Sequence, residues 1–124
     1  NFYEERRKDM HFKLLIALIE EDKTDEVLHA ARKAGATGAT VINHARGEGL
    51  NVPKSFFGLS LEMHRDLVMF IVEEHISREI LETIGEAGNF DQPGTGMVFQ
   101  IDVEDVVGIG VQIKSLADVV EEKI

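Results

Sequence analysis

Histidine is the side chain in this sequence with the widest chemistry near neutral pH, and two of the five histidines stand where they could meet. His44 lies near the end of one apolar segment and His64 lies just before another, so an antiparallel pairing of the segments would bring their imidazoles together. With Glu62 or Asp66 they would offer a mixed nitrogen and oxygen ligand set for a metal ion. Because lone histidines are usually surface or satisfied core residues, we assign no metal site from the sequence.

Nothing else in the chain supplies an obvious catalytic group. Cysteine is absent, which removes the thiolate as a nucleophile or metal ligand and excludes a disulfide framework. The sequence contains no recognisable Ser/His/Asp or Cys/His catalytic arrangement. The remaining histidines show no ligand spacing and receive no role: His11, His29 and His75. We therefore expect no enzymatic activity.

Two adjacent aromatic residues, Phe56 and Phe57, mark a different kind of candidate site. They lie in residues 45–64, a glycine-bearing segment with little hydrophobic periodicity, here called the effector loop. Loops longer than about 12 residues in compact domains are usually functional or disordered. With Arg46 and Lys54, the aromatic pair is interpreted as a hydrophobic, mildly basic contact for a protein partner. The alternative is that the two rings fold back and complete the core.

These candidate groups are positioned by a unit that occurs twice. The pattern that begins at Glu20 begins again at Glu73: two glutamates, then a hydroxyl residue, then a glutamate with two apolar residues, then Ala-Gly. Each copy is flanked by apolar runs that we expect to form strands. These runs are 14–19 and 39–42 around the first copy, and 67–72 and 97–103 around the second.

Each copy also carries helix signals. Apolar residues fall on a single stripe in both copies: Val27, Leu28, Ala31 and Ala34 in the first, and Ile76, Ile80, Leu81, Ile84 and Ala87 in the second. Asp22 or Thr24 can cap the first helix, and Ser77 can cap the second. Gly35 and Gly88 stand where the two helices should close.

Two strand-helix-strand units with right-handed crossovers predict an α+β fold. The arrangement is ferredoxin-like, βαββαβ, with a four-stranded antiparallel sheet and both helices on one face. We expect residues 12–124 to form this single domain, with a short strand and helix near the C-terminal end. Residues 1–11 are highly charged and are expected to form an N-terminal extension.

Two of the expected strands are apolar at consecutive positions, which is unusual for a sheet with one face in water. Residues 14–19 and 67–72 show no alternation, whereas 99–103 alternates between apolar and polar. A solvated face requires alternation, so both faces of the sheet must be covered. Two helices cover one face. We infer that other copies of the chain cover the second, giving an obligate homo-oligomer whose sheets face one another.

Composition limits the partners and the compartment. The net charge of -10 argues against binding to nucleic acid or to an anionic membrane surface, because such binding depends on clustered Lys and Arg. No apolar run approaches the roughly 20 residues of a membrane span. No small-residue cleavage site follows the first apolar run, so we expect no secretion signal and a cytoplasmic protein.

Three segments of the chain resemble the PII signalling family, the trimeric nitrogen regulatory proteins and their PII-like relatives. The most specific is the run KAGATGATV, residues 33–41. The second is the glycine turn 94–96 before the last strand, and the third is the glycine-rich segment that opens the effector loop. The resemblance covers roughly residues 12–111.

This resemblance implies a homotrimer with three clefts between subunits, in which an adenine nucleotide (AMP, ADP or ATP) binds as an effector. The residues that would lie against the base are Thr37, Gly38, Ala39 and Thr40. The residues that would face the phosphates are Arg46, Gly47, Gly49, Gly94, Thr95 and Gly96; glycine amides can approach an anion closely. The effector loop corresponds to the family's T-loop, which would dock on a regulated protein, by analogy a membrane transporter.

Departures from the family pattern are as informative as the matches. Met97 stands where the family places a phosphate-binding lysine, and Gly108 and Gly110 stand where it places two arginines. Each charge-assisted contact is worth about 1.5–3 kcal/mol, so di- and triphosphate binding should be weakened. The effector loop also lacks the family's tyrosine for covalent modification and its glutamine for magnesium and 2-oxoglutarate. The resemblance therefore indicates a divergent PII-like regulator rather than a nitrogen sensor proper.

Two other protein classes share this architecture. The copper-tolerance CutA-like trimers would make the chain a metal-binding or structural protein without nucleotide sensing, an alternative that the glycine pattern disfavours. Acylphosphatases need an arginine in an anion-cradling loop, whereas the first strand-to-helix connection here, residues 20–23, is acidic and would repel an anionic substrate.

Overall fold

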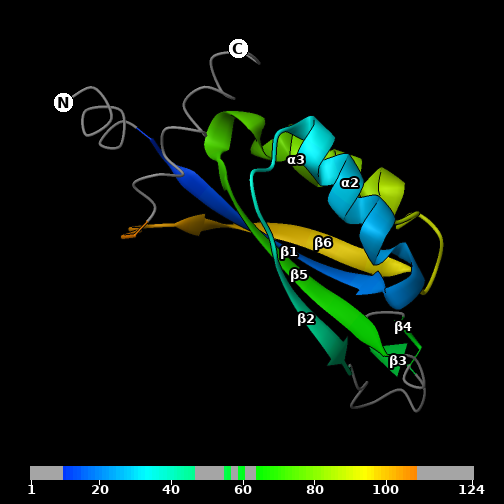
Figure 1. The fold of residues 1–124 in the computed structure, drawn as a ribbon. Helices are drawn as coiled ribbons and strands as arrows, with labels where there is room; N and C mark the ends of the chain where they lie inside the picture. The colour runs from blue at the N-terminus through cyan, green and yellow to red at the C-terminus, as the bar shows by residue number, and fades with distance from the viewer. Residues whose placement is uncertain (1–9, 47–54, 57–58, 61–63, 109–124) are drawn as a thin grey trace.

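The computed structural model describes residues 10–46, 55–56, 59–60 and 64–108 of the chain. An antiparallel sheet of four strands, in the order β2-β5-β1-β6, carries both α-helices on one face (Figure 1). The elements are β1 Phe12–Glu20, the 3-10 turn η1 Glu21–Lys23, α2 Thr24–Ala34, β2 Thr40–Ala45, β3 Ser55–Phe56, β4 Leu59–Ser60, β5 Arg65–Glu73, α3 Glu74–Ala87 and β6 Gly96–Val103. The predicted ferredoxin-like fold is confirmed.

The sequence repeat is visible in the element bounds. β1 and β5 are both nine residues long and begin and end at equivalent positions of the two copies. The copies differ after the strand, where the first has η1 and the second continues directly into α3. The Glu73 carboxylate caps α3 by accepting the His75 backbone N–H at 2.7 Å. Glu20, the equivalent of Glu73, makes no side-chain cap, and its carboxylate lies 3.6 Å from Arg65 Nη1.

The helix caps predicted from the sequence were wrong. The Thr24 hydroxyl donates to the buried carboxylate of Asp66 at 2.6 Å, so it fastens the start of α2 to β5. The Ser77 hydroxyl donates backward to the Glu74 carbonyl at 2.9 Å, inside α3. Asp22 lies within η1. Thr24 has the sequence position of a helix cap. Its hydroxyl instead donates to Asp66, which lies on a strand distant in sequence and could not be identified from the local pattern.

The two helices end differently. Gly35 closes α2 in the conformation expected of a glycine cap, with φ 123°. Gly88 follows α3 with φ −83°, and the left-handed residue is the next one, Asn89, with φ 60°. A Cβ on Gly88 would lie 2.2 Å from the Phe90 ring. Glycine is therefore needed at this position for space rather than for a left-handed backbone.

The core lies between the helices and one face of the sheet. Strand residues on this face are buried: Leu15, Ala17, Ile19, Val68, Phe70 and Val72. The predicted helix stripes meet them, with Val27, Ala31, Ala34, Ile76, Ile80 and Ile84 buried and Leu28, Leu81 and Ala87 half-buried against the cluster. Both predicted stripes are confirmed.

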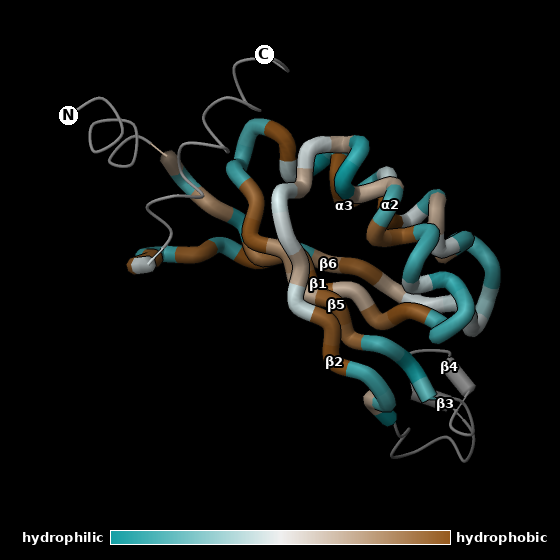
Figure 2. Tube along the Cα trace, viewed as in Figure 1, coloured by the Kyte–Doolittle hydropathy of each residue, from teal (hydrophilic) through white to brown (hydrophobic). Residues whose placement is uncertain are grey.

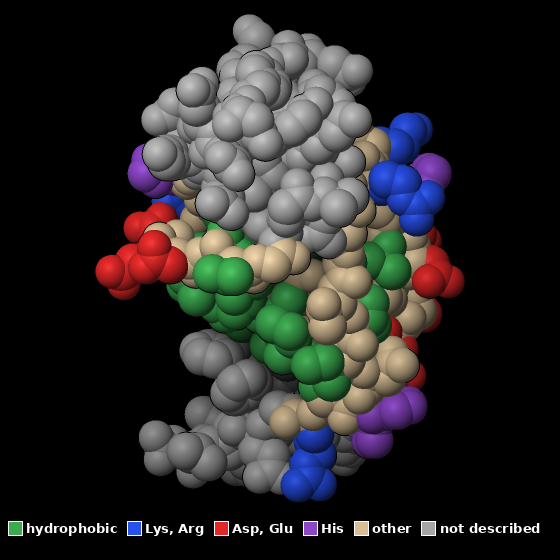
Figure 3. All heavy atoms as spheres, turned by 60° about the vertical axis from the view of Figure 1, so that its left-hand side comes forward, with side chains coloured by type: hydrophobic (Ala, Val, Ile, Leu, Met, Phe, Trp, Pro, Cys, Tyr) green, Lys and Arg blue, Asp and Glu red, His purple; other side chains and the backbone are tan. Residues whose placement is uncertain are grey.

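The opposite face of the sheet is apolar across all four strands, and is here called the apolar sheet face. Strand alternation places on it the residues between the buried ones, in three rows set by the strand register. These rows are Ile101–Leu14–Ile71, Phe99–Ile16–Met69 and Met97–Leu18–Leu67–Ile42. Ile42, Phe99 and Ile101 are 49%, 39% and 49% exposed. Figure 2 shows the middle parts of the strands as hydrophobic, and Figure 3 shows hydrophobic side chains gathered in a patch.

Several sequence predictions fall wholly or partly outside the described residues. These are the N-terminal extension, the effector-loop residues Gly47, Gly49, Lys54 and Phe57, and the C-terminal strand and helix beyond residue 108. Residues 104–108 are described and form no strand. Neither α2 nor α3, the α-helices of the described part, has the length and apolar composition that a membrane span requires.

We predict opposite effects of adding a methyl group at two glycines. A Cβ on Gly85, inside α3, meets nothing within 4 Å, so Gly85→Ala should raise the free energy of unfolding by about 0.5–1 kcal/mol. Gly96 has φ +150°, and a Cβ there would lie 2.4 Å from the Leu18 carbonyl oxygen. Gly96→Ala should cost about 1–3 kcal/mol. Denaturant titration of both variants checks this, and a Gly96→Ala as stable as the parent would contradict it.

We predict that His75 titrates above its ordinary range. A hydrogen bond from its Nδ1 to the Glu73 carboxylate, and the charge of that carboxylate, raise the pKa of His75. The resulting stabilisation is present below about pH 6.5, the ordinary histidine value, and is lost as pH rises through the raised pKa. NMR titration of the imidazole should show a lower pKa for His75 in Glu73→Gln than in the parent. An unchanged His75 pKa in Glu73→Gln would refute the pairing.

Candidate functional site

A hollow lies where α2 turns into β2, and three of the predicted base-contacting residues line it. Its volume is about 530 Å³, and its lining is Leu28, Arg32, Ala36, Thr37, Gly38, Ala39, Val41 and Phe70. The lining combines apolar walls, a hydroxyl and a guanidinium. Such a combination suits an aromatic base with a polar or anionic substituent, and the volume lies within the range of about 300–1,000 Å³ typical of small-molecule sites.

The fourth predicted base contact lies elsewhere. Thr40 pairs with Met69, which places it on the apolar sheet face, while its neighbour Val41 faces the α2–β2 hollow. The structure also adds a residue that the sequence reasoning missed. Arg32 supplies the cation of the hollow from the last turn of α2. Its position in that turn, just before the glycine-threonine run, was the available signal.

Gly38 stands out because the fold gives no reason for a glycine there. A Cβ at this position would meet nothing within 4 Å, and Gly38 is not among the positive-φ glycines. Within the described residues, a Cβ at this position would therefore meet no clash. The hollow keeps an open approach at this point, which a ligand or a neighbouring subunit can use.

A buried arginine, Arg65, holds the turn from Gly94 to Gly96 through hydrogen bonds to the turn's carbonyl groups. The sequence analysis did not assign this residue to the site. Arg65 is 2% exposed and donates from Nη2 to the Gly94 carbonyl at 2.7 Å and from Nη1 to the Thr95 carbonyl at 3.3 Å. The same guanidinium lies near Glu20. Arg65 is the first residue of β5, so it ties the exit of the effector loop to this turn.

Some polar groups of the turn itself already form hydrogen bonds within the protein. The Thr95 N–H donates to the Gln92 carbonyl at 3.3 Å, and its hydroxyl lies 2.7 Å from the Asn89 carbonyl. Gly96 is required by its close approach to the Leu18 carbonyl. Gly94 has φ 79°, a conformation that favours glycine. Of the three predicted phosphate contacts in the turn, Thr95 thus has a clear structural role, and its amide is already engaged.

One protomer does not bring the two halves of the predicted nucleotide site together. Residues 37–39 precede β2 and residues 94–96 lead into β6, and these strands are the opposite edges of the sheet (Figure 1). Arg46, the predicted cation, is exposed and directly follows β2. Met97 lies on the apolar sheet face beside Leu18. A site built from all these residues needs more than one copy of the chain.

The effector loop is described only in part. Ser55 and Phe56 form β3, which pairs with Leu59 and Ser60 of β4. Lys54 and Phe57 lie outside the described residues, so the predicted contact surface for a partner stays a prediction.

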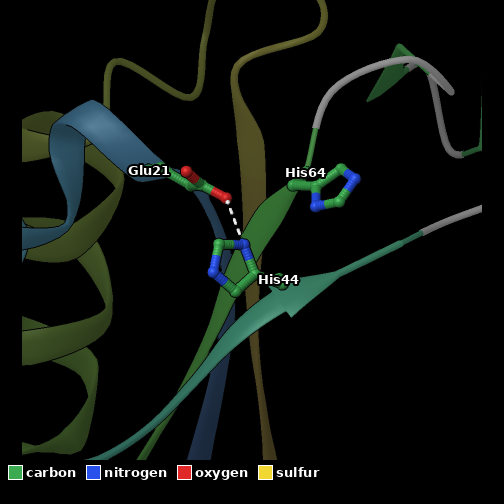
Figure 4. Close-up of side chains that lie close together, drawn as sticks. All are labelled: Glu21, His44 and His64. Carbon is green, nitrogen blue, oxygen red and sulfur yellow. Dashed lines mark ion pairs between the residues drawn. The ribbon is translucent and has the colours of Figure 1, made fainter.

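A cluster of potential metal ligands forms at the base of the effector loop. His44 and His64 do meet, with ring centroids 5.6 Å apart in an edge-to-face arrangement. The third member is Glu21 of η1, whose Oε1 lies 3.2 Å from His44 Nδ1 (Figure 4). The predicted third ligand, Asp66, is buried against Thr24, and Glu62 lies outside the described residues.

Glu21 was missed because it is distant in sequence. The relevant feature is the sheet order. Because β5 lies between β2 and β1 and runs antiparallel to both, the end of β2, the start of β5 and the end of β1 lie at the same end of the sheet. A second cluster, Glu73, Glu74 and His75, also has ligand-like spacing. Two of its members already form the cap of α3, which accounts for that grouping.

Comparisons with known proteins agree with this architecture. A protein from Methanothermobacter thermautotrophicus, named nitrogen regulatory protein P-II 2, is 28% identical over 101 residues, covering 78% of this chain and 88% of the relative. The structure of CPII from Thiomonas intermedia K12, bound to ADP, AMP and acetate, superposes with a TM-score of 0.60 at 21% identity, covering 82% of this chain and 93% of that one.

A PII-like signalling protein from Thermus thermophilus gives a TM-score of 0.56 at 22% identity, covering 75% of this chain and 86% of that one. At these identities the two structures are evidence for the fold alone. The family model described as nitrogen regulatory protein P-II matches residues 12–112, which is most of the chain. The protein therefore belongs to the P-II family.

Proposed function

We propose that this protein is a homotrimeric PII-like signalling regulator that binds an adenine nucleotide between its subunits and controls a protein partner through the effector loop. The observation that carries the proposal is the division of the predicted nucleotide residues between the two edges of the sheet. The P-II family match favours this function over a CutA-like structural role. We propose no catalytic activity.

The apolar sheet face supports the assembly. Fully burying one large aliphatic or aromatic side chain is worth about 1.5–3 kcal/mol, and this face presents a continuous set of them. A patch of this kind marks an interface. In a closed ring of three or more subunits, each contact is head-to-tail and joins unlike surfaces of neighbouring subunits. A trimeric ring would therefore place the α2–β2 hollow of one subunit beside the turn 94–96 of the next.

The chemistry of the hollow supports a nucleotide with few phosphates. Leu28, Val41 and Phe70 offer apolar walls for a base, and Arg32 offers a planar pair of donors suited to a phosphate. Met97, Gly108 and Gly110 stand at the three positions where the family pattern places phosphate-binding cations. The CPII structure was solved with ADP and AMP. We propose that AMP or ADP binds at least as well as ATP.

Calorimetric titration with AMP, ADP and ATP tests the nucleotide site. Arg32→Gln should weaken binding about tenfold, because one charge-assisted contact is lost. Gly38→Val should weaken it by filling the approach to the hollow. Arg78→Gln is the matched control, because Arg78 lies on α3 in an exposed pair with Glu82. If no nucleotide binds below millimolar concentration, or if Arg32→Gln behaves like Arg78→Gln, the proposed site is wrong.

Analytical ultracentrifugation tests the assembly. The parent should sediment as a trimer at micromolar concentration. Ile101→Lys places a charge on the apolar sheet face and should shift the protein toward monomers, because the ammonium group would be buried without a partner. His29→Lys adds a positive charge to an exposed position of α2 and should leave the trimer intact. A monomeric parent would remove the cleft on which the nucleotide proposal depends.

The partner is proposed by family analogy. The effector loop, with Phe56, Phe57 and Lys54, would dock on a regulated cytoplasmic protein surface, such as the inner face of a membrane transporter. Nucleotide binding would bias the loop toward one of two states and so change its affinity for that partner. The net charge of -10 disfavours nucleic acid as a class of partner on electrostatic grounds.

A further inference from the structure

Three segments far apart in the sequence place potential metal ligands around one open depression. The depression has a volume of about 520 Å³ and is lined by Glu21, Asp22, His44 and His64. Glu21 and Asp22 come from η1, His44 from the end of β2, and His64 from the residue before β5. In Figure 4 the His44 ring lies between the Glu21 carboxylate and the His64 ring.

The spacing of these side chains fits a single metal ion. Two ligand atoms at about 2.0–2.2 Å from a tetrahedral zinc ion lie about 3.3–3.6 Å apart. The Glu21 and His44 ligand atoms are already 3.2 Å apart. One ligand atom from each of Glu21, His44 and His64 lies within 4.8 Å of the others. The His44 and Glu21 side chains are 70% and 45% exposed, so small rotations can close the remaining distance.

The backbone holds His44 in a conformation that directs it toward this point. The register between β2 and β5 shifts between Ile42 and Ala45, and His44 lies inside the shift with φ 64°. Positive φ is uncommon for residues other than glycine. The bulge turns the histidine out of the regular strand alternation, and there it meets both Glu21 and His64.

We propose that Glu21, His44 and His64 form a binding site for a divalent transition-metal ion of the zinc class, with Asp22 or water available to complete the coordination. Imidazole nitrogens with a carboxylate suit zinc and its neighbours, whereas magnesium and calcium prefer oxygen ligands throughout. This site is separate from the α2–β2 hollow and does not depend on nucleotide binding.

The position of the site gives the metal a defined structural effect. His44 directly precedes the effector loop and His64 is its last residue, and Glu21 belongs to the connection between β1 and α2. A bound ion would join the end of β2, the start of β5 and η1, and would fix the separation of the two ends of the loop. The ion would therefore hold in place the end of β2 and the start of β5, between which the effector loop extends.

Metal titration of the purified full chain tests the proposal. Calorimetry with zinc chloride should show one ion per chain, and magnesium chloride should show no binding at the same concentrations. His44→Gln and His64→Gln should each weaken zinc binding about tenfold or more, because each removes one of three ligands. His29→Gln is the matched control and should bind as the parent does. Equal zinc affinity in His44→Gln, His64→Gln and the parent would overturn the proposal.

A second measurement reports where the ion binds. Amide hydrogen exchange at the paired residues Ala45 and Arg65 should slow when zinc is added to the parent and should not change in His64→Gln. Cobalt chloride should give visible absorption typical of a mixed nitrogen and oxygen site in the parent alone. Zinc-dependent slowing that persists in His64→Gln would place the ion elsewhere. Either result can be obtained whether or not a nucleotide binds.

Discussion

Both faces of the sheet of this protein are apolar, and most other features depend on that constraint. Two helices cover one face, and their apolar stripes account for the buried half of β1 and β5. The second face is equally apolar, and it includes Phe99 and Ile101 of β6, whose polar neighbour Gln100 points to the helix side. A strand that turns its polar residues toward its own helices and its apolar ones outward is built for contact with another chain.

The same constraint determines where a ligand can bind. The helix-covered face is filled and the opposite face is the proposed association surface, so the edges and ends of the sheet remain for small molecules. The α2–β2 hollow lies at one edge and the turn 94–96 leads into the other. Arg65 connects the turn 94–96 to the exit of the effector loop, because it begins β5 directly after that loop and donates to the carbonyls of Gly94 and Thr95.

Hydrophobic periodicity and the internal repeat were sufficient to predict the fold, because both are properties of local sequence. The strands, the helix stripes and the antiparallel sheet with both helices on one face followed from them. The caps failed because Thr24 is drawn to Asp66, a residue that only the sheet brings near. Within the candidate sites, residues 37–39 were found through their glycine pattern. Arg65 and Glu21 were missed because their partners, Gly94 and His44, are distant in sequence. Arg32 was missed although it lies just before the glycine-threonine run.

The two helices begin differently, so one copy of the repeated unit can stabilise the fold while the other copy varies. In the second copy Ile76 is buried, and a glutamate and a histidine close the first turn of α3, so that stretch is committed to stability. The first copy has Lys23 at the equivalent position and none of the η1 residues is buried. Substitutions can therefore accumulate in η1 at little energetic cost. Evolution is free to try new side chains beside the effector loop in one half while the other half preserves the architecture.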